Sequence, residues 1–494
     1  MTKQYRPWTP EQSHLLPPSP TDWLPEGHLA YFIIDLVRVL DLKAIEDVIQ
    51  ERDGRGTRPY SPRMMMALLV YAYCVGVYSS RKIERATYDD VAFRVIAGGE
   101  HPDHTRINEF RLEHRKALGD QFDQVLKLCK RAGLVAMGHV SIDGTKVQAN
   151  ASKHKAMSYG RMKDEERRLS AEVETMLFRA DEEDAREDAL YGKDKRGDEL
   201  PEELQRRESR LKKIREAKEA LEREAAEARA MQLRELAKGE RLRAETAPNS
   251  RDRKQAAARA SREEKQAAEL FPRDDDDDDD PPPNATDLPR HRVHATPEGK
   301  PKNEAQRNFT DPDSRIMVRN GVFLQAYNAQ AAVNESQVIV AHGVSNQPPD
   351  HDYLLPMLER IRRNCGAPPE RLTADSGYFS ESNFGYCDAE RIDAYIATGR
   401  KLDSADIGKL PMTPAADARW RMHQKLSTPE GRAIYARRKV LPEPVFGQIK
   451  SAMGFRRFSL RGLPKVVAEW AIVCTCHNVL KLFRAKFQLR VAPG

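Results

Sequence analysis

The chain of 494 residues is too long for one compact domain, and its length predicts two or three. Hydrophobic residues make up 39% and charged residues 32%, so a core can form beneath an extensively solvated surface. The formal net charge of +6 is unevenly distributed. Residues 400–494 hold 19 Lys and Arg against 6 Asp and Glu, which leaves the preceding residues with a net charge of −7. A basic block on an otherwise acidic chain favours a site for a polyanion.

The composition argues against a membrane or secreted protein. The N-terminus is polar and lacks a signal-peptide pattern. The longest apolar run, residues 64–78, has 15 residues, fewer than the ~20 needed to cross a bilayer, so we expect a buried helix. Six widely spaced cysteines indicate a reducing compartment, and we expect a cytoplasmic location. Cys474, Cys476 and His477 lie in an apolar, helix-like stretch without a second ligand pair at zinc-finger spacing, so we expect packing there.

Residues 1–135 are predicted to form a helical domain that binds DNA. Ser61 precedes a proline and a Met-rich helix, Ser79 precedes a second helix over 81–96, and a third begins near His104. Helices joined by short turns, the last with a polar and basic leading face, favour a helix-turn-helix-like DNA reader. A helical bundle with a solvated face is the alternative. The cations expected to contact DNA here are Arg106, Arg111 and Arg115.

The pattern changes after this domain. Residues 139–149 alternate and are β-branched, which predicts a strand carrying Asp143. Residues 159–271 are rich in Ala, Glu, Lys and Arg and predict a charged helical insertion, either a hairpin or a coiled coil. Residues 272–304 include seven consecutive aspartates followed by three prolines, and this composition predicts a disordered acidic and Pro-rich linker. Calcium binding or nucleic-acid mimicry by the aspartates is the alternative.

Strand patterns return in the C-terminal part of the chain. Two neighbouring strands are predicted at 322–333 and 337–344, then a helix at 354–361 and strands at 371–375 and 392–397. Together with the strand carrying Asp143, they predict a mixed α/β sheet in an RNase H-like order. The catalytic core is therefore expected to comprise residues 136–158 and 305–494, with the helical domain and the charged insertion attached to it.

Three acidic residues are the candidates for catalysis and metal binding. Asp143 and Asp375 each follow a strand-like run and have a glycine close by, as expected where a ligand approaches the end of a strand. Glu443 lies in a helical segment, and Lys450 follows seven residues later, about two helical turns, on the same expected face. Carboxylates suit hard divalent cations, and two such ions can serve an in-line phosphoryl displacement. The alternative for each aspartate is a turn cap.

With these residues, the chain resembles bacterial insertion-sequence transposases of the DDE class, in the IS4/IS5-like superfamily and closest to the IS1182 family. Asp143, Asp375 and Glu443 match the three acids of that class. The tyrosine–arginine–glutamate–lysine signature of the superfamily maps onto Tyr435, Arg438, Glu443 and Lys450. Here four residues separate the arginine from the glutamate instead of three, so Arg437 or Lys439 could take its role.

Two further stretches, residues 310–315 and 327–330, look like landmarks of the same family. The first holds Asp311 and Asp313 around a proline. Its turn-forming composition favours a structural role for both aspartates over an accessory metal or DNA role.

The resemblance implies cut-and-paste DNA transposition. Such an enzyme binds the terminal inverted repeats of its own element, cleaves the ends with two Mg²⁺ ions, which Mn²⁺ can replace, and joins them to target DNA. Coordinated cleavage of two ends implies a homodimer on double-stranded DNA, in the bacterial cytoplasm at the nucleoid and without a membrane. The resemblance assigns catalysis and metal binding to Asp143, Asp375 and Glu443, and DNA contacts to Tyr435, Arg437, Arg438, Lys439 and Lys450.

Two other classes of function remain compatible with the sequence. A decayed, catalytically inactive transposase would act as a DNA-binding repressor, and an RNase H-like nuclease would cut DNA without strand transfer. The three acids in their expected surroundings favour the transposase over the repressor. Only a transposase yields joined DNA strands, so the products of the reaction separate it from the nuclease.

Overall fold

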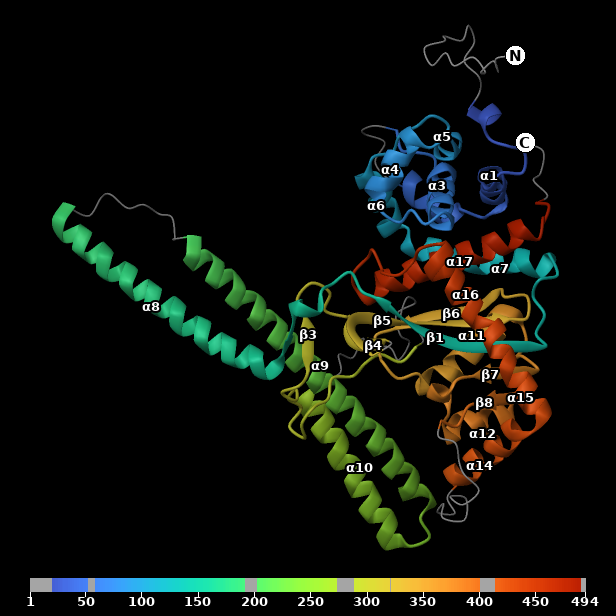
Figure 1. Ribbon diagram of the computed structural model, residues 1–494. Helices are drawn as coiled ribbons and strands as arrows, with labels where there is room; N and C mark the ends of the chain where they lie inside the picture. The colour runs from blue at the N-terminus through green and yellow to red at the C-terminus, as the bar shows by residue number, and fades with distance from the viewer. Residues whose placement is uncertain are drawn as a thin grey trace.

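The computed structural model describes residues 20–51, 58–191, 202–272, 288–319, 321–399 and 414–489. A helical domain lies on one side of an α/β core, and long helices project away from the core (Figure 1). The seven aspartates lie outside the described residues.

The core is a mixed six-stranded sheet in which five strands follow the order β4-β5-β1-β7-β8. The sixth strand, β6, pairs with residues 328–333 of β5, after the part of β5 that pairs with β4. The central strand β1 pairs antiparallel with β5 and parallel with β7, and β7 pairs parallel with β8. This combination of directions makes the core the mixed α/β sheet that the strand pattern predicts. The strands are β1 His139–Gln148, β4 Arg315–Arg319, β5 Val322–Asn334, β6 Ile339–Ser345, β7 Arg371–Ala374 and β8 Asp393–Ile396.

Helices cover both faces of the sheet. On β6, the ring of His342 contacts Phe122 of α7 (Arg115–Arg131), whereas a Cβ on the next residue, Gly343, would approach Arg360 of α11 (Leu354–Cys365). Successive residues of a strand point to opposite faces, so α7 and α11 lie on different sides of the sheet. With both faces covered, β5 is buried almost throughout its length.

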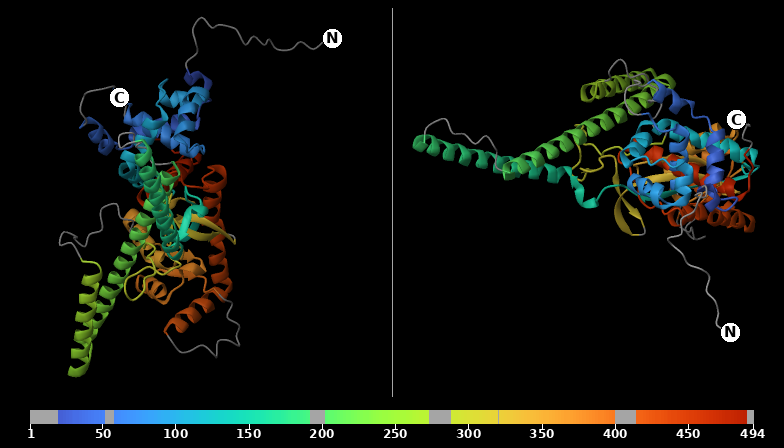
Figure 2. Two further views of the ribbon diagram at one scale, coloured as in Figure 1. Left: turned by 90° about the vertical axis from the view of Figure 1, so that its left-hand side faces the viewer. Right: turned by 90° about the horizontal axis from the view of Figure 1, so that it is seen from above.

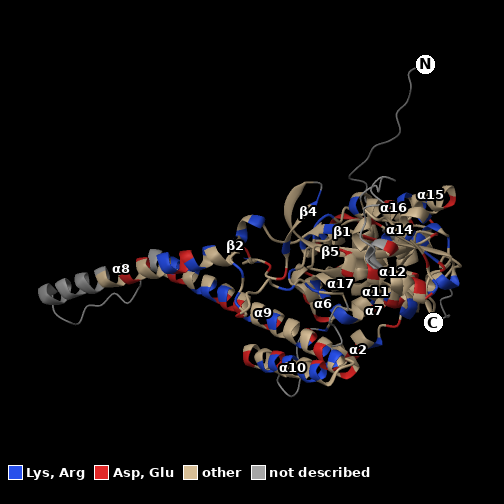
Figure 3. Ribbon diagram, turned by 90° about the horizontal axis from the view of Figure 1, so that it is seen from below, with Lys and Arg blue, Asp and Glu red and all other residues tan. Residues whose placement is uncertain are grey.

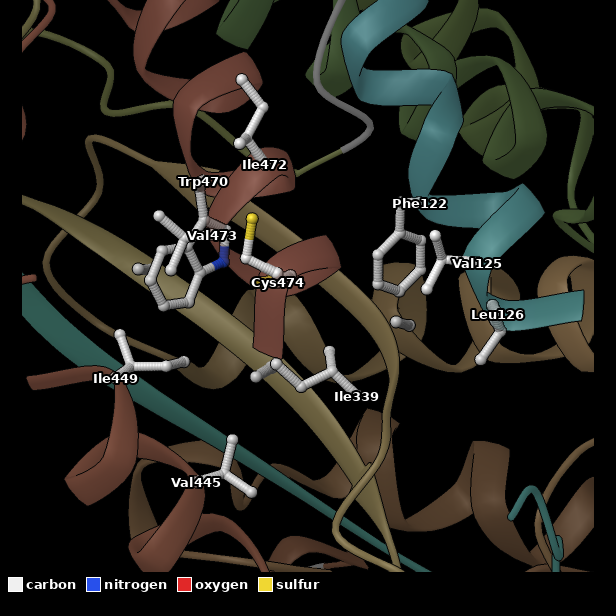
Figure 4. Close-up of a cluster of buried hydrophobic side chains, with 14 of the residues drawn as sticks. Phe122, Val125, Leu126, Ile339, Val445, Ile449, Trp470, Ile472, Val473 and Cys474 are labelled. Atoms are coloured by element: carbon white, nitrogen blue, oxygen red, sulfur yellow. The ribbon is translucent and has the colours of Figure 1, made fainter. Parts of the chain in front are cut away.

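The C-terminal helix α17 (Leu463–Arg484) joins the helical domain to the sheet. It packs against α3, α7 and β6. Figure 4 shows Trp470 and Val473 of α17 in one cluster with Phe122 of α7 and Ile339 of β6. The helix is long and apolar enough to cross a membrane, but 83% of its most apolar stretch is buried within the protein. This burial gives α17 the character of a core helix.

The helical domain contains a short 3₁₀ turn, Pro20–Trp23, and seven helices among the described residues. The cysteines and histidine at 474–477 are buried in α17 beneath this domain, so the prediction of packing is confirmed. The helices are α1 Leu29–Val39, α2 Lys43–Gln50, α3 Pro62–Cys74, α4 Ser80–Asp89, α5 Val91–Ala97, α6 His104–Glu113 and α7 Arg115–Arg131.

The prediction of a single helix over 81–96 is wrong, because the helix is interrupted at Asp90 and two helices form instead. This residue ends α4 in an extended conformation and caps α5, where its carboxylate accepts hydrogen bonds from the backbone N–H groups of Ala92 (2.8 Å) and Phe93 (3.2 Å). Aspartate is a favoured N-cap residue because it satisfies amides that have no partner within the helix.

Arg111 is buried, contrary to its predicted role as an exposed DNA contact. Its guanidinium donates hydrogen bonds to the Tyr73 hydroxyl (3.2 Å), the Tyr78 carbonyl (3.1 Å) and Asn108 (3.0 Å). Tyr73 in turn lies 3.5 Å from the carboxylate of Glu469 in α17. The reason for burial is electrostatic: Glu469 is fully enclosed, and Arg111 supplies a nearby positive charge.

The charged segment predicted at 159–271 holds three helices, which form the projecting part of the molecule (Figures 1 and 2). Acidic and basic residues are mixed along α9 and α10 (Figure 3). A two-stranded ribbon, β2 Ala156–Ser158 with β3 Gln306–Asn308, forms the base of the insertion. The helices are α8 Tyr159–Tyr191, α9 Glu202–Thr246 and α10 Ser250–Leu270.

The disordered linker predicted at 272–304 is too long, because residues 288–304 have a defined structure. Leu288 and Val293 are buried, and an isolated β-bridge joins Ala295 to Pro301. Apolar side chains that enter the core fix this part of the segment. Residues 273–287 lie outside the described residues.

The structural role predicted for Asp311 and Asp313 is confirmed. Asp311 accepts hydrogen bonds from the Tyr327 hydroxyl (2.7 Å) and the Gly462 amide (3.1 Å), and Asp313 accepts one from the Leu463 amide (2.7 Å). Both carboxylates therefore bind the N-terminus of α17, where amides lack partners within the helix and the helix dipole favours negative charge.

Replacement of Arg111 by Met is expected to destabilise the protein by about 2–3 kcal/mol, because Tyr73 and Glu469 lose a buried donor and a compensating charge. Arg106→Met is the matched control. Arg106 is exposed on α6, and its ion pair among the described residues is with Glu109 at the surface, so a change within about 0.5 kcal/mol is expected. Urea unfolding followed by circular dichroism measures both. Equal unfolding midpoints for the two variants would contradict a stabilising role for Arg111.

Candidate active site

The pairing of β1 with β7 brings two acidic residues together. In the parallel register Ile142 lies opposite Ala374, so the next residues, Asp143 and Asp375, are neighbours on adjacent strands. Adjacent strands are about 4.8 Å apart, and equivalent positions of a parallel pair point to the same face. Asp375 directly follows β7 and caps the 3₁₀ turn Ser376–Tyr378, where its carboxylate accepts a hydrogen bond from the amide of Gly377 (2.8 Å).

Arg438 lies between the two carboxylates. Its Nη2 atom is 3.1 Å from Asp143 Oδ2 and 3.6 Å from Asp375 Oδ2. Arg438 belongs to the 3₁₀ turn Arg437–Val440, which follows α15 (Pro429–Ala436). The neighbouring cations are placed differently, because Arg437 pairs with Glu335 (2.8 Å) and Lys439 is exposed. Of the three cations considered for the signature arginine, Arg438 is the one in contact with the acids.

The environment of Asp143 disfavours its charge. Burial, opposed by the Arg438 guanidinium and reinforced by the negative charge of Asp375, raises the pKa of Asp143 to about 6. The amide of Gly144 also donates a hydrogen bond to its carboxylate (2.9 Å). One guanidinium therefore compensates the two carboxylates only in part.

Tyr435 and Lys450 line the same region. Tyr435, near the end of α15, interacts with the Arg438 side chain, and burial raises the pKa of its hydroxyl. Lys450 is half-buried, and its ammonium group donates a hydrogen bond to the Thr145 hydroxyl, two residues beyond Asp143 on β1. Both signature residues thus lie beside Arg438 or β1.

Among the described residues, no hydrogen bond or ion pair connects Glu443 with Asp143 or Asp375. Glu443 occupies the exposed first turn of α16 (Pro442–Gly447), a helix that packs against β1 and β5. The predicted common helical face of Glu443 and Lys450 is altered by a π-helical turn, Gln448–Ala452, which changes the angular spacing between them. Within the described ranges, no three Asp, Glu, His or Cys side chains converge as a metal-binding group.

The residues present suit a hard divalent cation. Asp143 and Asp375 offer carboxylate oxygens on one face, and their partly uncompensated negative charge favours a cation. Arg438 Nε is buried and has no hydrogen-bond partner among the described residues, so an anionic oxygen that enters the site can bind to it. The geometry can therefore accept both a metal ion and a phosphate.

The opposite face of β1 carries a polar network that sequence reasoning missed. Gln330 of β5 receives a hydrogen bond from the Tyr378 hydroxyl and donates to Asn328 (2.9 Å) and Asp350 (3.0 Å). Asp350 also pairs with Lys146 of β1 (3.1 Å). The signal was present, because the polar residues at 327–330 interrupt an otherwise apolar strand.

This network explains the glycine after Asp143. A Cβ on Gly144 would overlap the Gln330 side chain, which lies directly across from it in the β1–β5 register. Only glycine leaves room for the Gln330 amide. Asp143 therefore presents its carboxylate on one face of β1, and Gly144 leaves the opposite face open for Gln330.

The structure does not bring the predicted DNA contacts of the helical domain to this site. Arg106 and Arg115 are exposed on α6 and α7 of the helical domain, and among the described residues neither contacts Asp143, Asp375 or Glu443. They belong to a surface separate from the carboxylates.

Comparison with known families assigns both parts of the chain. Residues 293–479 match a Transposase DDE domain, and residues 18–113 match a Transposase domain (DUF772). The first match includes Asp375 and Glu443, and the second covers the helical domain through α6. The searches of curated proteins and of solved structures gave no match.

The strand that carries Asp143 precedes the matched DDE segment, but its pairing with β5 and β7 makes it the central strand of the same sheet. The two matches together cover more than half of the chain, and a DDE domain implies an RNase H-like fold. The chain belongs to the DDE-class DNA transposases, enzymes that cleave DNA and transfer its strands.

Proposed function

We propose that this transposase belongs to the IS1182 family, binds the terminal inverted repeats of its own insertion sequence, cleaves the element ends and joins them to target DNA. The observation that carries this proposal is the juxtaposition of Asp143 and Asp375 on adjacent strands, with Arg438 between them. A DNA-binding repressor would not need two partly buried carboxylates held side by side against their repulsion.

Asp143, Asp375 and Glu443 are proposed to hold two Mg²⁺ ions, which Mn²⁺ can replace. When bound, the ions supply an activated nucleophile and stabilise the departing oxyanion of an in-line displacement. Glu443, whose side chain is exposed on α16, would supply the third carboxylate of this set. Arg438 would bind the scissile phosphate, because its Nε has no hydrogen-bond partner among the described residues.

Tyr435 and Lys450 are proposed to orient the same phosphate group, and Arg437 and Lys439 to contact DNA further along the backbone. Lys450 beside Thr145 keeps a positive charge within reach of Asp143. Arg106 and Arg115 are proposed to bind DNA from the helical domain, whereas Arg111 is not, because it is enclosed. Phosphate contacts of this kind give an affinity that falls with salt.

The proposed division of the chain follows these roles. Residues 1–135 bind DNA, and residues 136–158 together with 288–494 form the catalytic core and its base. Residues 159–271 are the insertion, which offers a surface for a second copy because coordinated cleavage of two ends needs a homodimer. The enzyme acts on chromosomal DNA in the bacterial cytoplasm.

The variants Asp143→Asn, Asp375→Asn and Glu443→Gln are expected to bind the element ends as the wild type does, but to lose cleavage by at least ~10³-fold, which corresponds to about 4 kcal/mol of transition-state stabilisation. Each substitution removes a charge and a metal ligand with little change in volume. Gel-shift binding and cleavage with Mg²⁺ on DNA that carries the element's own ends measure the two properties separately.

Asp417→Asn serves as the control, because Asp417 is an exposed acid on α14 (Pro414–Ser427) whose ion pair among the described residues is with the exposed Arg421. Wild-type binding without cleavage would favour the repressor. Cleavage without joined products would favour the nuclease. Full activity of any of the three variants would remove that residue from the catalytic set.

Asp143→Asn is also expected to change the pH dependence of stability. The pKa of Asp143 is raised to about 6 in the folded protein, so the folded state binds more protons than the unfolded state between about pH 4 and pH 6. The contribution of Asp143 to stability therefore falls as pH rises through this range. In EDTA the free energy of unfolding of the variant should equal that of the wild type near pH 4 and should exceed it by about 1–3 kcal/mol at pH 8.

Addition of Mg²⁺ at pH 8 should raise the unfolding temperature of the wild type more than that of Asp143→Asn, because the cation relieves the repulsion between the aspartates. Thermal unfolding followed by circular dichroism measures both effects, and Asp417→Asn, with its exposed side chain on α14, controls for loss of charge without burial. If Asp143→Asn is no more stable than the wild type at pH 8, the ionised Asp143 carboxylate does not destabilise the folded protein as proposed.

A further inference from the structure

A groove of about 800 Å³ lies beyond the end of β1, outside the carboxylate site. Residues from four parts of the chain form it: the end of β1 with the segment after it, Thr310 before β4, the β4–β5 hairpin and the segment before α17. Among the described residues that line it, none is acidic. Its cationic residues are Lys153, Lys155, Arg319, Arg457 and Arg461, with His154 beside them.

The cations of the groove are held by the backbone of β1 and the residues after it. Arg319 donates a hydrogen bond to the Lys146 carbonyl (3.1 Å), and Arg461 to the Asn150 carbonyl (2.9 Å). Arg457 donates to the Asn150 side chain (3.0 Å). None of these three bonds uses a carboxylate, and among the described residues none of the three guanidinium groups forms an ion pair, although Asp311 lies near enough to Arg461 to interact with its charge.

The groove continues from the candidate active site. Arg319 donates its hydrogen bond to the carbonyl of Lys146, the residue that follows Thr145 on β1, and the Thr145 hydroxyl accepts a hydrogen bond from Lys450 of the active site. From Asp143 to Gln148, at the near end of the groove, β1 advances roughly 17 Å, about five stacked nucleotides at ~3.4 Å each. A strand whose phosphate occupies the carboxylate site can therefore reach the groove.

Part of the groove lining is apolar and exposed. Val322 and Phe323 of the β4–β5 hairpin line it and are 61% and 60% exposed, and Val318, directly across from Phe323 in the β4–β5 register, is 52% exposed. Phe323 and Val318 share one face of the hairpin, and exposed apolar side chains that lie together mark a site for a partner. The faces of nucleic-acid bases are apolar and stack on aromatic rings, whereas paired bases within a duplex are covered by their neighbours.

We propose that this groove binds an unpaired stretch of the DNA strand next to the cleaved phosphate, with its phosphates on the cationic wall and a base on Phe323. The proposal rests on the transposase function and adds to it a defined path for the strand. Cationic side chains that bind the backbone, together with an exposed aromatic ring on which a base can stack, are the combination by which proteins bind single strands without reading their sequence. The absence of acidic residues among the described lining disfavours a basic peptide as the occupant.

The cationic wall is tested with Lys153→Glu/Lys155→Glu, and the matched control is Lys254→Glu/Lys265→Glu, which makes the same change of charge on exposed positions of α10. The probes are a fluorescent single-stranded 15-mer and a blunt 15-base-pair duplex of the same sequence. The groove variant should bind the single strand at least 10-fold more weakly than the control does. Its log–log salt slope should be smaller by about 1.4, as expected for two lost contacts to single-stranded phosphates.

The apolar wall is tested with Phe323→Ala against Phe178→Ala, which removes an equally exposed ring from α8. Loss of one stacked base should weaken single-strand binding about 5- to 100-fold without a change in salt slope. A 2-aminopurine in the probe should lose its fluorescence quenching in Phe323→Ala only. Circular dichroism confirms that all four variants are folded.

Outcomes that overturn this proposal are distinct from those that overturn the transposase function. If both groove variants bind the single strand as their controls do, while the wild type still cleaves its element ends, the groove is not a strand site. If they lose duplex binding but keep single-strand binding, the groove holds a duplex and the assignment of an unpaired strand is wrong.

Discussion

The register between β1 and β7 is the constraint on which the candidate active site depends. It sets Asp143 beside Asp375 at the separation of adjacent strands, where two negative charges repel each other. The fold tolerates this arrangement because Arg438 bridges the carboxylates and because β1, as the central strand, is held from both sides by β5 and β7. A shift of one residue in the β1–β7 pairing would turn one carboxylate to the opposite face, where Gln330 and its partners occupy the space. The polar network behind β1 and the charges in front of it therefore specify the same register.

The connection between the helical domain and the core is made by burial around α17. Its apolar residues contact both parts, while Asp311 and Asp313 bind its N-terminus and Glu469 is enclosed within it. The carboxylate of Glu469 accepts hydrogen bonds from the amides of Ser459 and Leu460 and faces Tyr73 of α3. A buried acid is costly unless donors surround it, so these contacts fix the two parts in one relative arrangement.

Local signals predicted much of this structure, and the errors arose where distant residues decide. The alternation around Asp143 and the strand-like run before Asp375 identified both strands, because burial patterns are local. The cap at Asp90 was equally local and could have been recognised from an aspartate before an apolar run. The burial of Arg111 could not be recognised in this way, because it depends on Tyr73 and on Glu469, which follows 358 positions later in the sequence. The placement of Glu443 relative to the aspartates likewise follows from how α16 packs, which helical spacing alone does not determine.

Charge shows the same division between sequence and fold. The excess of Lys and Arg in residues 400–494 indicated where a polyanion would bind, but it did not indicate which cations act together. In the folded chain, Arg438 and Lys450 stand beside the acids, whereas Arg457 joins Lys153 and Arg319 from elsewhere in the sequence to form the groove. Positive charge thus extends from the active site to the groove. In the active site two carboxylates face one bridging guanidinium, whereas the described residues that line the groove include no acid. Such a gradient attracts a phosphate backbone along its length while it admits a cation only at the carboxylates, and this separates strand binding from chemistry within one continuous surface.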